Sequence, residues 1–295
     1  MPDTTFKSGF FTIIGSPNVG KSTLINRLVS QKIAIVTERA QTTRNKITGI
    51  LTKKDCQLIF IDTPGVIAPK NRLGEYMQNT AYNALNEVEG IAFVVDALVG
   101  VKERDETLFL RIKKAKAPII PIINKIDRST LKDVCDLEDF FGEELNPIRI
   151  SARDGTNVGK LIERFESLAV PGPMYFPEDM VTDQPERTIC AEFIREAALT
   201  MIRDEIPHGI GVYIDKIEKR DDKDITDVFA TIYCERESHK GIIIGKNGAM
   251  MKRIGIDSRH EIEWLLDSHV NLKLYVKVKP DWRNSGLTLR ELGYE

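Results

Sequence analysis

Short apolar runs alternate with longer amphipathic segments through the first half of the chain. The apolar runs are too apolar for half-exposed strands, and so they predict strands buried on both faces of a sheet. They fall at Phe10–Ile14, Lys46–Thr52, Gln57–Ile61, Ile91–Asp96, Ile119–Ile123 and Pro147–Ile150. Helices are predicted between them at Lys21–Gln31, Arg72–Glu87, Arg104–Lys116, Leu131–Gly142 and Val158–Leu168. This alternation predicts an α/β domain with a doubly wound, largely parallel sheet over residues 1–170.

The pattern changes near Val170. Prolines and a glycine crowd the next fifteen residues at Pro171, Gly172, Pro173, Pro177 and Pro185, which predicts an ordered linker over residues 171–187. The remaining residues, 188–295, predict a smaller α+β domain in the order α-β-β-α-α-β. Its expected elements are a helix at Ile189–Glu205, strands at Gly211–Lys219 and Val228–Arg236, a helical region at Lys240–Asp267 split by a glycine loop, and a strand at Val270–Lys279.

Composition narrows the class of protein but does not indicate a function. A length of 295 residues suits two domains, and 42% hydrophobic with 29% charged residues is ordinary for a soluble globular protein. The net charge of −2 does not indicate a polyanion partner for the chain as a whole. The four cysteines lie far apart, which argues against disulfides and a zinc site. Met1–Gly9 lacks a signal-peptide pattern and no run reaches the ~20 apolar residues of a membrane span, so we expect a cytoplasmic protein.

A glycine-rich loop joins the first predicted strand to the first predicted helix. The glycines let successive N–H groups and the helix N-terminus wrap phosphate groups. In this motif, G-x-x-x-x-G-K-S, the lysine bridges the β- and γ-phosphates and the serine hydroxyl binds Mg²⁺. The chain therefore predicts a nucleoside triphosphate site with Mg²⁺, against the alternative of a purely structural turn. The loop residues are Gly15, Ser16, Pro17, Asn18, Val19, Gly20, Lys21 and Ser22, with Thr23 next in the helix.

A second motif, Asp62-Thr63-Pro64-Gly65, follows the predicted strand Gln57–Ile61. An acidic residue at the carboxyl end of such a strand lies beside the phosphate loop. There Asp62 can hold Mg²⁺ through a water molecule. The N–H of Gly65 can reach the γ-phosphate, so Gly65 joins Lys21 as a candidate catalytic residue.

Two further short motifs indicate the base. Asn124, Lys125 and Asp127 end one predicted strand, and Ser151, Ala152 and Arg153 follow the last strand of the domain. The Asp127 carboxylate can accept hydrogen bonds from N1–H and the 2-amino group of guanine. Adenine lacks both donors and would leave that carboxylate unpaired. GTP and GDP are therefore the expected ligands, and an ATP-dependent enzyme would leave Asp127 without a role.

In this order, the motifs resemble the Era family of translation-factor-class GTPases. The similarity runs over nearly the whole chain and includes Ala40–Arg44, Phe176–Gln184 and Leu289–Tyr294. The resemblance implies a P-loop GTPase domain that hydrolyses GTP slowly to GDP and phosphate. It also implies that Thr43 reaches Mg²⁺ and the γ-phosphate as part of the first switch, with Thr42 as the alternative.

Val66 stands where Ras-like enzymes carry a glutamine that orients the attacking water. Era-like proteins share this hydrophobic residue, which leaves a partner or a monovalent cation to supply the missing group. In some relatives the asparagine equivalent to Asn18 helps to coordinate K⁺. The alternative is that Asn18 only stabilises the loop.

The second glycine motif, Gly245-Lys246-Asn247-Gly248, proves little alone, but its surroundings resemble a type II KH domain. In KH domains this loop clamps a nucleic-acid backbone. Five basic residues lie between Lys240 and Arg259 against the single acid Asp257, and Lys252 and Arg253 are the expected RNA contacts beyond the loop. A solvated helix face with an ordinary turn is the alternative.

The family resemblance implies a monomeric GTPase switch that binds the 3′ end of small-subunit ribosomal RNA and assists 30S subunit assembly. A regulatory GTPase whose C-terminal domain binds protein or the inner membrane surface is the alternative. Era-like proteins are also linked to membrane association, and the basic amphipathic segment Met250–Leu266 is compatible with peripheral contact at the cytoplasmic face.

Overall fold

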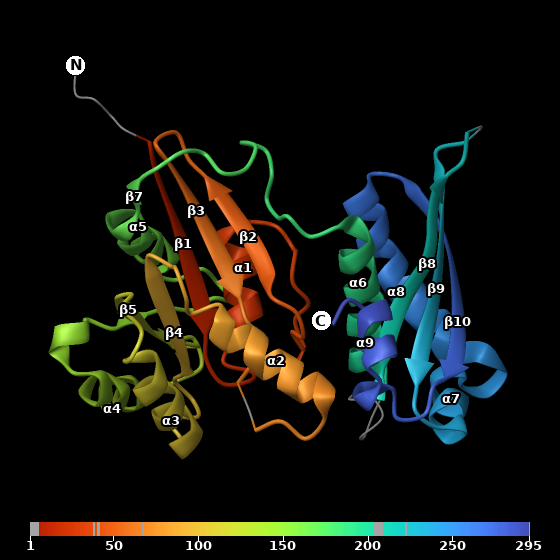
Figure 1. The fold of residues 1–295 in the computed structure, drawn as a ribbon, viewed down its shortest axis with the longest axis horizontal. Helices are drawn as coiled ribbons and strands as arrows, with labels where there is room; N and C mark the ends of the chain where they lie inside the picture. The colour runs from red at the N-terminus through yellow and green to blue at the C-terminus, as the bar shows by residue number, and fades with distance from the viewer. Residues whose placement is uncertain are drawn as a thin grey trace. The chain divides into compact units, whose positions relative to one another are not determined.

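A computed structural model of the protein describes residues 6–37, 39, 42–66, 68–202, 209–221 and 223–294. The chain divides into two compact units. The first comprises Met1–Ala68 with Met77–Asp183, and the second comprises Pro69–Tyr76 with Gln184–Glu295. Each unit has a sheet of its own (Figure 1).

The sheet of the first unit has the order β2-β3-β1-β4-β5-β6. Most neighbours run parallel, which confirms the doubly wound α/β domain; β2 is antiparallel to β3, and the short β7 pairs antiparallel with the start of β1. The strands are β1 (Lys7–Ile14), β2 (Ile47–Thr52), β3 (Cys56–Asp62), β4 (Gly90–Asp96), β5 (Ile119–Asn124), β6 (Ile148–Arg149) and β7 (Val170–Pro171).

Helices cover both faces of this sheet and create two apolar cores. On one face Phe165 packs between Phe11 and Phe60, with ring centroids 4.7 and 5.0 Å away. On the other face Phe109 stacks on Phe93. A buried phenylalanine contributes roughly 1.5–3 kcal/mol, so these clusters hold the helices to the sheet. The helices are α1 (Lys21–Leu28), α2 (Arg72–Asn83), α3 (Glu103–Ile112), α4 (Leu131–Phe141) and α5 (Val158–Leu168), with a 3₁₀ turn η1 at Glu143–Leu145.

The first part of the predicted linker is bound to the sheet of the first unit. Gln57, which is fully buried in β3, accepts hydrogen bonds from the N–H groups of Tyr175 and Phe176 and donates to the Phe176 carbonyl. Further on, the Ile50 N–H donates to the Val181 carbonyl at 2.9 Å. Residues up to Asp183 therefore belong to the first unit.

The second unit has a three-stranded sheet in the order β10-β9-β8, with β9 parallel to β10 and antiparallel to β8. The expected α-β-β-α-α-β order is confirmed by α6 (Glu186–Met201), β8 (Gly211–Lys219), β9 (Ile225–Cys234), α7 (Glu237–Ile244), α8 (Ala249–Leu266) and β10 (His269–Val278). Between α7 and α8 lies the 3₁₀ turn η3 (Lys246–Gly248); the turn η4 (Trp282–Asn284) and helix α9 (Gly286–Glu291) complete the unit. The helix predicted to reach Glu205 ends at Met201, because Ile202 has an extended backbone; residues 203–208 lie outside the described residues.

None of the helices that the structure describes is both long enough and apolar enough to cross a membrane.

Candidate nucleotide site and RNA loop

The predicted phosphate loop lies between β1 and α1 and is held in place by a residue from the end of β5. Gly20 has φ of 98°, and a Cβ there would lie 2.3 Å from Asn124 Nδ2, so only glycine fits this position. The Asn124 amide donates to the Val19 carbonyl at 2.8 Å. The loop is thus shaped in part by a residue from the end of β5, which belongs to the predicted base site.

Lys21 is buried at the centre of this loop, and its ammonium donates to the carbonyls of Gly15 at 3.0 Å and Ser16 at 2.9 Å. Burial lowers the pKa of Lys21 to about 8, while the carboxylates of Asp62 and Asp105 act in the opposite direction. A buried cation needs an anionic partner. The phosphates of a nucleotide would supply one at the position where Lys21 is expected to act.

The three predicted metal residues come together at one point. Ser22 Oγ lies 2.8 Å from Asp62 Oδ2 and 2.7 Å from Thr43 Oγ1, and Thr43 Oγ1 lies 3.4 Å from the same carboxylate oxygen. Asp62 Oδ1 is buried, and among the residues that the structure describes no donor reaches it with hydrogen-bond geometry. Burial raises the pKa of Asp62 to about 6, against the effects of Lys21 and of hydrogen bonds from Ser22 and Thr43.

This oxygen-only donor set, with one unsatisfied buried carboxylate oxygen, fits Mg²⁺. Across the residues described by the structure, no group of three or more His, Cys, Asp or Glu side chains could hold a metal ion. The protein therefore offers an incomplete set of ligands, which matches the preference of Mg²⁺ for a few protein groups together with substrate phosphates and water.

The two candidate switch threonines point to different partners. Thr42 Oγ1 lies 2.8 Å from Thr37 Oγ1 and 2.8 Å from the Arg39 carbonyl oxygen, whereas Thr43 lies beside Ser22 as described above. This geometry favours Thr43 as the metal residue. Of the similar segment Ala40–Arg44, Ala40 and Gln41 lie outside the described residues.

The second predicted switch follows β3 directly. Thr63 Oγ1 donates to the Ile13 carbonyl at 2.9 Å, which ties this turn to β1. A Cβ on Gly65 would lie 2.9 Å from atoms of Pro17, so the glycine allows close approach to the phosphate loop. Val66 packs partly buried against the core beside β4 and offers no polar group to water.

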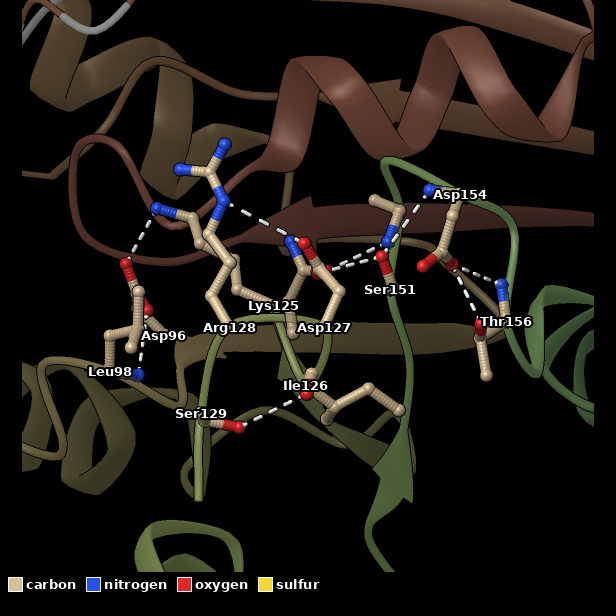
Figure 2. A network of polar contacts seen from close by, with 12 residues as sticks. Asp96, Leu98, Lys125, Ile126, Asp127, Arg128, Ser129, Ser151, Asp154 and Thr156 are labelled. Atoms are coloured by element: carbon tan, nitrogen blue, oxygen red, sulfur yellow. Dashed lines mark hydrogen bonds and ion pairs between the residues drawn. The ribbon is translucent and has the colours of Figure 1, made fainter.

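The predicted base site forms one connected polar network (Figure 2). Lys125 has φ of 69°, and its ammonium lies 2.6 Å from both the Asn18 carbonyl oxygen and Asp96 Oδ2. Asp127 accepts a hydrogen bond of 2.7 Å from Ser151 Oγ at one carboxylate oxygen, while Arg128 Nε lies 3.7 Å from the other. The carboxylate expected to recognise guanine is therefore fixed in orientation from the neighbouring loop.

The loop after β6 completes the site. The Ala152 N–H donates to Asn124 Oδ1 at 3.0 Å, so Asn124 joins this loop to the phosphate loop. Arg27 of α1 donates to the carbonyls of Ala152 and Arg153. The Asp154 N–H donates to Ser151 Oγ, which also holds Asp127 (Figure 2). The nucleotide-site residues predicted from β1, β3, β5 and β6 thus lie at the carboxyl ends of these strands, either in the last residue of a strand, on the loop that follows it, or at the start of α1.

The glycine loop of the second unit is exposed and tightly turned. Gly245 and Gly248 have φ of 71° and 76°, and Asn247 between them has φ of 51°. Lys246 and Asn247 are exposed, as are Lys252 and Arg253 in the first turns of α8. These four side chains are available to a ligand at the start of α8.

Several residues in the site were missed by the sequence reasoning. Asp96 ends β4 as Asp62 ends β3, so its position at a strand end was a usable signal. Asp105 of α3 accepts a hydrogen bond from Ser16 Oγ and from the Lys102 N–H, and nothing in its local sequence marks it. Gln57 and Arg27 hold the surrounding loops, and they too become recognisable only through tertiary contacts.

Comparisons with known proteins found matches to both predicted domains. Residues 10–125 match the family model described as 50S ribosome-binding GTPase, and residues 205–283 match the KH domain model. The chain is 50% identical to GTPase Era of Alkaliphilus oremlandii, with 99% of this chain and 100% of the relative covered. It is 48% identical to GTPase Era of Clostridioides difficile, with 98% and 99% covered.

Solved structures agree as well. A crystal structure of Era in complex with MgGDPNP and nucleotides 1506–1542 of 16S ribosomal RNA matches with a TM-score of 0.94 and 39% identity, covering 98% of this chain and 99% of that one. An Aquifex aeolicus Era variant bound to GDP·AlF4⁻ matches with the same score, identity and coverage. With its guanine-nucleotide loops on one unit and its KH loop on the other, the chain belongs to the Era family of GTPases, which hydrolyse GTP.

Proposed function

We propose that this GTPase is a switch that binds small-subunit ribosomal RNA near its 3′ end and assists assembly of the 30S subunit. The observation that carries this proposal is an exposed GxxG loop on a chain that also has the guanine-nucleotide network. The Era structure bound to a 16S ribosomal RNA fragment and a GTP analogue supports it further. The protein would act as a monomer in the cytoplasm.

In the proposed mechanism, Lys21 binds the β- and γ-phosphates and Asp127 recognises guanine. Asn124 and Lys125 brace the loops, with Lys125 held by Asp96. Ser151 keeps the Asp127 carboxylate in one orientation, which removes the need to order it when the base binds. Backbone N–H groups of the phosphate loop and of Gly65 face the phosphates, where they can stabilise charge that develops as the γ-phosphate leaves.

Ser22, Thr43 and Asp62 would hold Mg²⁺, the first two through their hydroxyls and Asp62 through water. Bound Mg²⁺ would neutralise phosphate charge during hydrolysis. Thr43 belongs to the first switch, so its place beside Ser22 and Asp62 would link the order of this segment to the γ-phosphate.

The chain itself lacks a side chain at position 66 that can orient the attacking water, since Val66 is apolar and packs against the core. The intrinsic rate would therefore be slow. We propose K⁺ as a second cofactor near Asn18, whose backbone is held in the left-handed region at φ of 65° by the phosphate loop.

For the RNA, the exposed loop Gly245–Gly248 would clamp the backbone, and Lys252 and Arg253 would neutralise adjacent phosphates. A second candidate is peripheral contact with the inner membrane surface, which the exposed Trp264 and Ile256 on the same helix favour, because aromatic and basic residues together suit a lipid interface.

The test is crosslinking of the GTP-bound protein to cellular RNA, followed by mapping of the contacts. Crosslinks at the 3′ end of small-subunit ribosomal RNA, lost in a Lys246→Asp/Asn247→Asp variant, are expected. Filter binding to that RNA is compared with sedimentation on anionic vesicles. Binding to vesicles without binding to RNA would replace the RNA role by the membrane role.

A further inference from the structure

The three-stranded sheet of the second unit has one face covered by helices, and on its other face Thr231 and Tyr233 of β9 are buried while side chains of β10 are exposed. On β9 the residues Val228, Ala230 and Ile232 are fully buried, and α6 and α8 contact the sheet from that side (Figure 1). On β10, Leu274 faces α8, because a Cβ on Gly255 of that helix would lie 3.6 Å from its Cδ1. Successive side chains alternate between the faces of a strand, so Tyr275 points to the other face, where it is 50% exposed.

We propose that this second face is a further RNA-binding surface, formed by Lys273, Tyr275 and Lys277 of β10 with Phe229 of β9. We call these four residues the outer strip. It would take single-stranded RNA that continues beyond the nucleotides clamped by the GxxG loop. The inference rests on the proposed RNA-binding function and extends it to a surface made by the sheet rather than by α7 and α8.

The geometry of the outer strip suits an extended chain of nucleotides. Lys273, Tyr275 and Lys277 occupy alternate positions, which places them ~6.6 Å apart along one face. Lys273 is paired in register with Phe229, and its ammonium lies 5.1 Å from the centre of that ring. Single-stranded nucleic acid binds where bases stack on aromatic rings while cations follow the backbone. An exposed sheet face with aromatic residues is used in this way by RRM domains.

The charges of the strip favour a polyanion over other occupants. β10 carries no acidic residue between His269 and Val278. Lys273 and Lys277 form no ion pair with a carboxylate in the part of the chain that the structure describes, whereas Lys279 beyond the strand pairs with Glu291.

Two acidic side chains of the neighbouring strands have hydrogen-bond partners of their own. Asp227 accepts hydrogen bonds from Arg220 at 2.7 Å and from Asn271 at 2.6 Å. Asp215 accepts one of 2.8 Å from Thr231. Arg220 offsets the charge of Asp227, and the two exposed lysines on either side of Tyr275 then present a site for the phosphates and a base of a nucleic acid.

The experiment compares two single-stranded RNA probes from the 3′ end of small-subunit ribosomal RNA, one of about 4 nucleotides, which fills a KH loop, and one of about 12 nucleotides. Affinity is measured by fluorescence anisotropy at fixed salt. Tyr275→Ala should weaken binding of the longer probe by roughly 5- to 100-fold, because a stacked base is lost. It should leave the shorter probe unaffected. Tyr275→Phe, which keeps the ring, should bind the longer probe like the wild type.

The lysines are tested by salt dependence. Each phosphate contact on single-stranded RNA contributes ~0.7 to the slope of log affinity against log salt. Lys273→Ala/Lys277→Ala should therefore lower the slope for the longer probe by about 1.4. Lys219→Glu, at an exposed position on the opposite edge strand β8, should leave the slope for this probe within ~0.7 of the wild-type value.

Trp264→Ala is the matched control for an exposed aromatic residue, since Trp264 is 55% exposed on α8 in the same unit. If Tyr275→Ala binds the longer probe like the wild type, or if Trp264→Ala weakens it instead, the outer strip is not an RNA surface. Lys246→Asp/Asn247→Asp decides the proposed function separately. Unchanged binding of both probes by that variant would contradict RNA binding at the GxxG loop, whatever the result for Tyr275.

Discussion

Ser22 donates a hydrogen bond of 2.8 Å to one oxygen of the buried Asp62 carboxylate, and the other oxygen has no partner among the described residues. The hydroxyl and the carboxylate that would share Mg²⁺ are therefore in place without it. A buried carboxylate with an unsatisfied oxygen is costly unless a cation or a proton compensates it. The local structure is thus arranged for ligand binding rather than for stability of the free protein.

Replacing Asp62 by Asn tests this arrangement. Asn keeps the shape but loses the negative charge that would hold a water-bridged ion. We expect the Mg²⁺ concentration for half-maximal GTP hydrolysis to rise about 10- to 100-fold, as for other residues that support a metal through an intervening group. The control is thermal unfolding without Mg²⁺ and nucleotide, where the variant should still unfold as a folded protein, because Asn keeps the shape and can accept the hydrogen bond from Ser22. An unchanged Mg²⁺ requirement would remove Asp62 from the metal site.

The second prediction concerns the base. Asp127→Asn turns an acceptor into a donor, which suits the 2-oxo group of xanthine better than the 2-amino group of guanine. We expect the nucleotide preference of the variant to move from GTP towards xanthosine triphosphate. Competition with a labelled nucleotide measures this preference. Ser151→Ala is the matched variant, because it removes the 2.7 Å hydrogen bond that orients Asp127. It should lower the affinity for GTP by roughly 3- to 10-fold without changing the preferred base. A variant at 127 that still prefers GTP at full affinity would show that guanine is recognised elsewhere.

The third prediction concerns the monovalent cation. Because Val66 cannot position water, K⁺ at Asn18 would supply part of the missing stabilisation. Hydrolysis should be faster in K⁺ than in Na⁺ at equal ionic strength, and Asn18→Ala should abolish the difference. Asn18→Asp retains an oxygen at this position and should keep a response to K⁺. Equal wild-type rates in the two salts would leave Asn18 with the single role of shaping the loop.

Gln57 gives a fourth prediction about the connection that follows the first sheet. Its side-chain amide donates to Thr52 Oγ1 and the Phe176 carbonyl, and it accepts from two backbone N–H groups of the connection. Gln57→Leu should lower the free energy of unfolding by about 1–3 kcal/mol, because it leaves buried polar groups unpaired. It should also speed limited proteolysis between Gly172 and Asp183.

Thr182→Val serves as the comparison for this prediction, since it removes the 2.7 Å hydrogen bond from Thr182 Oγ1 to the Thr48 carbonyl. Its loss should be about 0.5–1.5 kcal/mol. Equal protease resistance of the wild type and the Gln57 variant would mean that other contacts fix the connection.

Most of the fold was predictable because local patterns and topology agree. Each buried strand is a continuous apolar run in the sequence. A motif follows each of four such strands: the phosphate loop, the switch motif and the two base motifs. The direction of β2 was not distinguished, although only Lys53–Asp55 separates β2 from β3. A connection this short allows antiparallel pairing and excludes a parallel crossover.

Contacts between distant residues were beyond the sequence. Asp105 and Ser16 are 89 positions apart, and Gln57 and Phe176 are 119 apart. Each pair forms because packing brings two elements together, and neither Asp105 nor Gln57 belongs to a motif. Thr43 could be preferred over Thr42 only by resemblance, whereas the side-chain directions in the structure separate them.

The last prediction is that nucleotide state and RNA affinity are coupled. Thr43, beside the predicted metal residues, lies just before β2. β2 in turn holds the end of the connection through Ile50 and Val181. A path along β2 and through this one hydrogen bond therefore leads from the first switch to the connection and on to Asp183, where the first unit ends. A switch that becomes ordered on the γ-phosphate can bias a second domain through such an element.

We expect GTP to favour a state with the GxxG groove open to RNA, and GDP a state with it covered or misaligned. RNA affinity measured at fixed salt with a non-hydrolysable GTP analogue and with GDP should then differ by about 5- to 150-fold, since coupling of this kind is typically about 1–3 kcal/mol. Linkage requires that RNA raise the protein's affinity for the GTP analogue, relative to its affinity for GDP, by the same factor. This provides an independent measurement. Lys246→Asp/Asn247→Asp should abolish RNA binding, because two negative charges would face the phosphate backbone, while nucleotide affinity survives in the other unit. Gln57→Leu should reduce the coupling factor without changing the affinity for GDP, because it loosens the connection and leaves the nucleotide loops intact. Equal RNA affinities in the two nucleotide states would mean that the chain carries two independent modules, and the path from Thr43 to Asp183 would then be structural only.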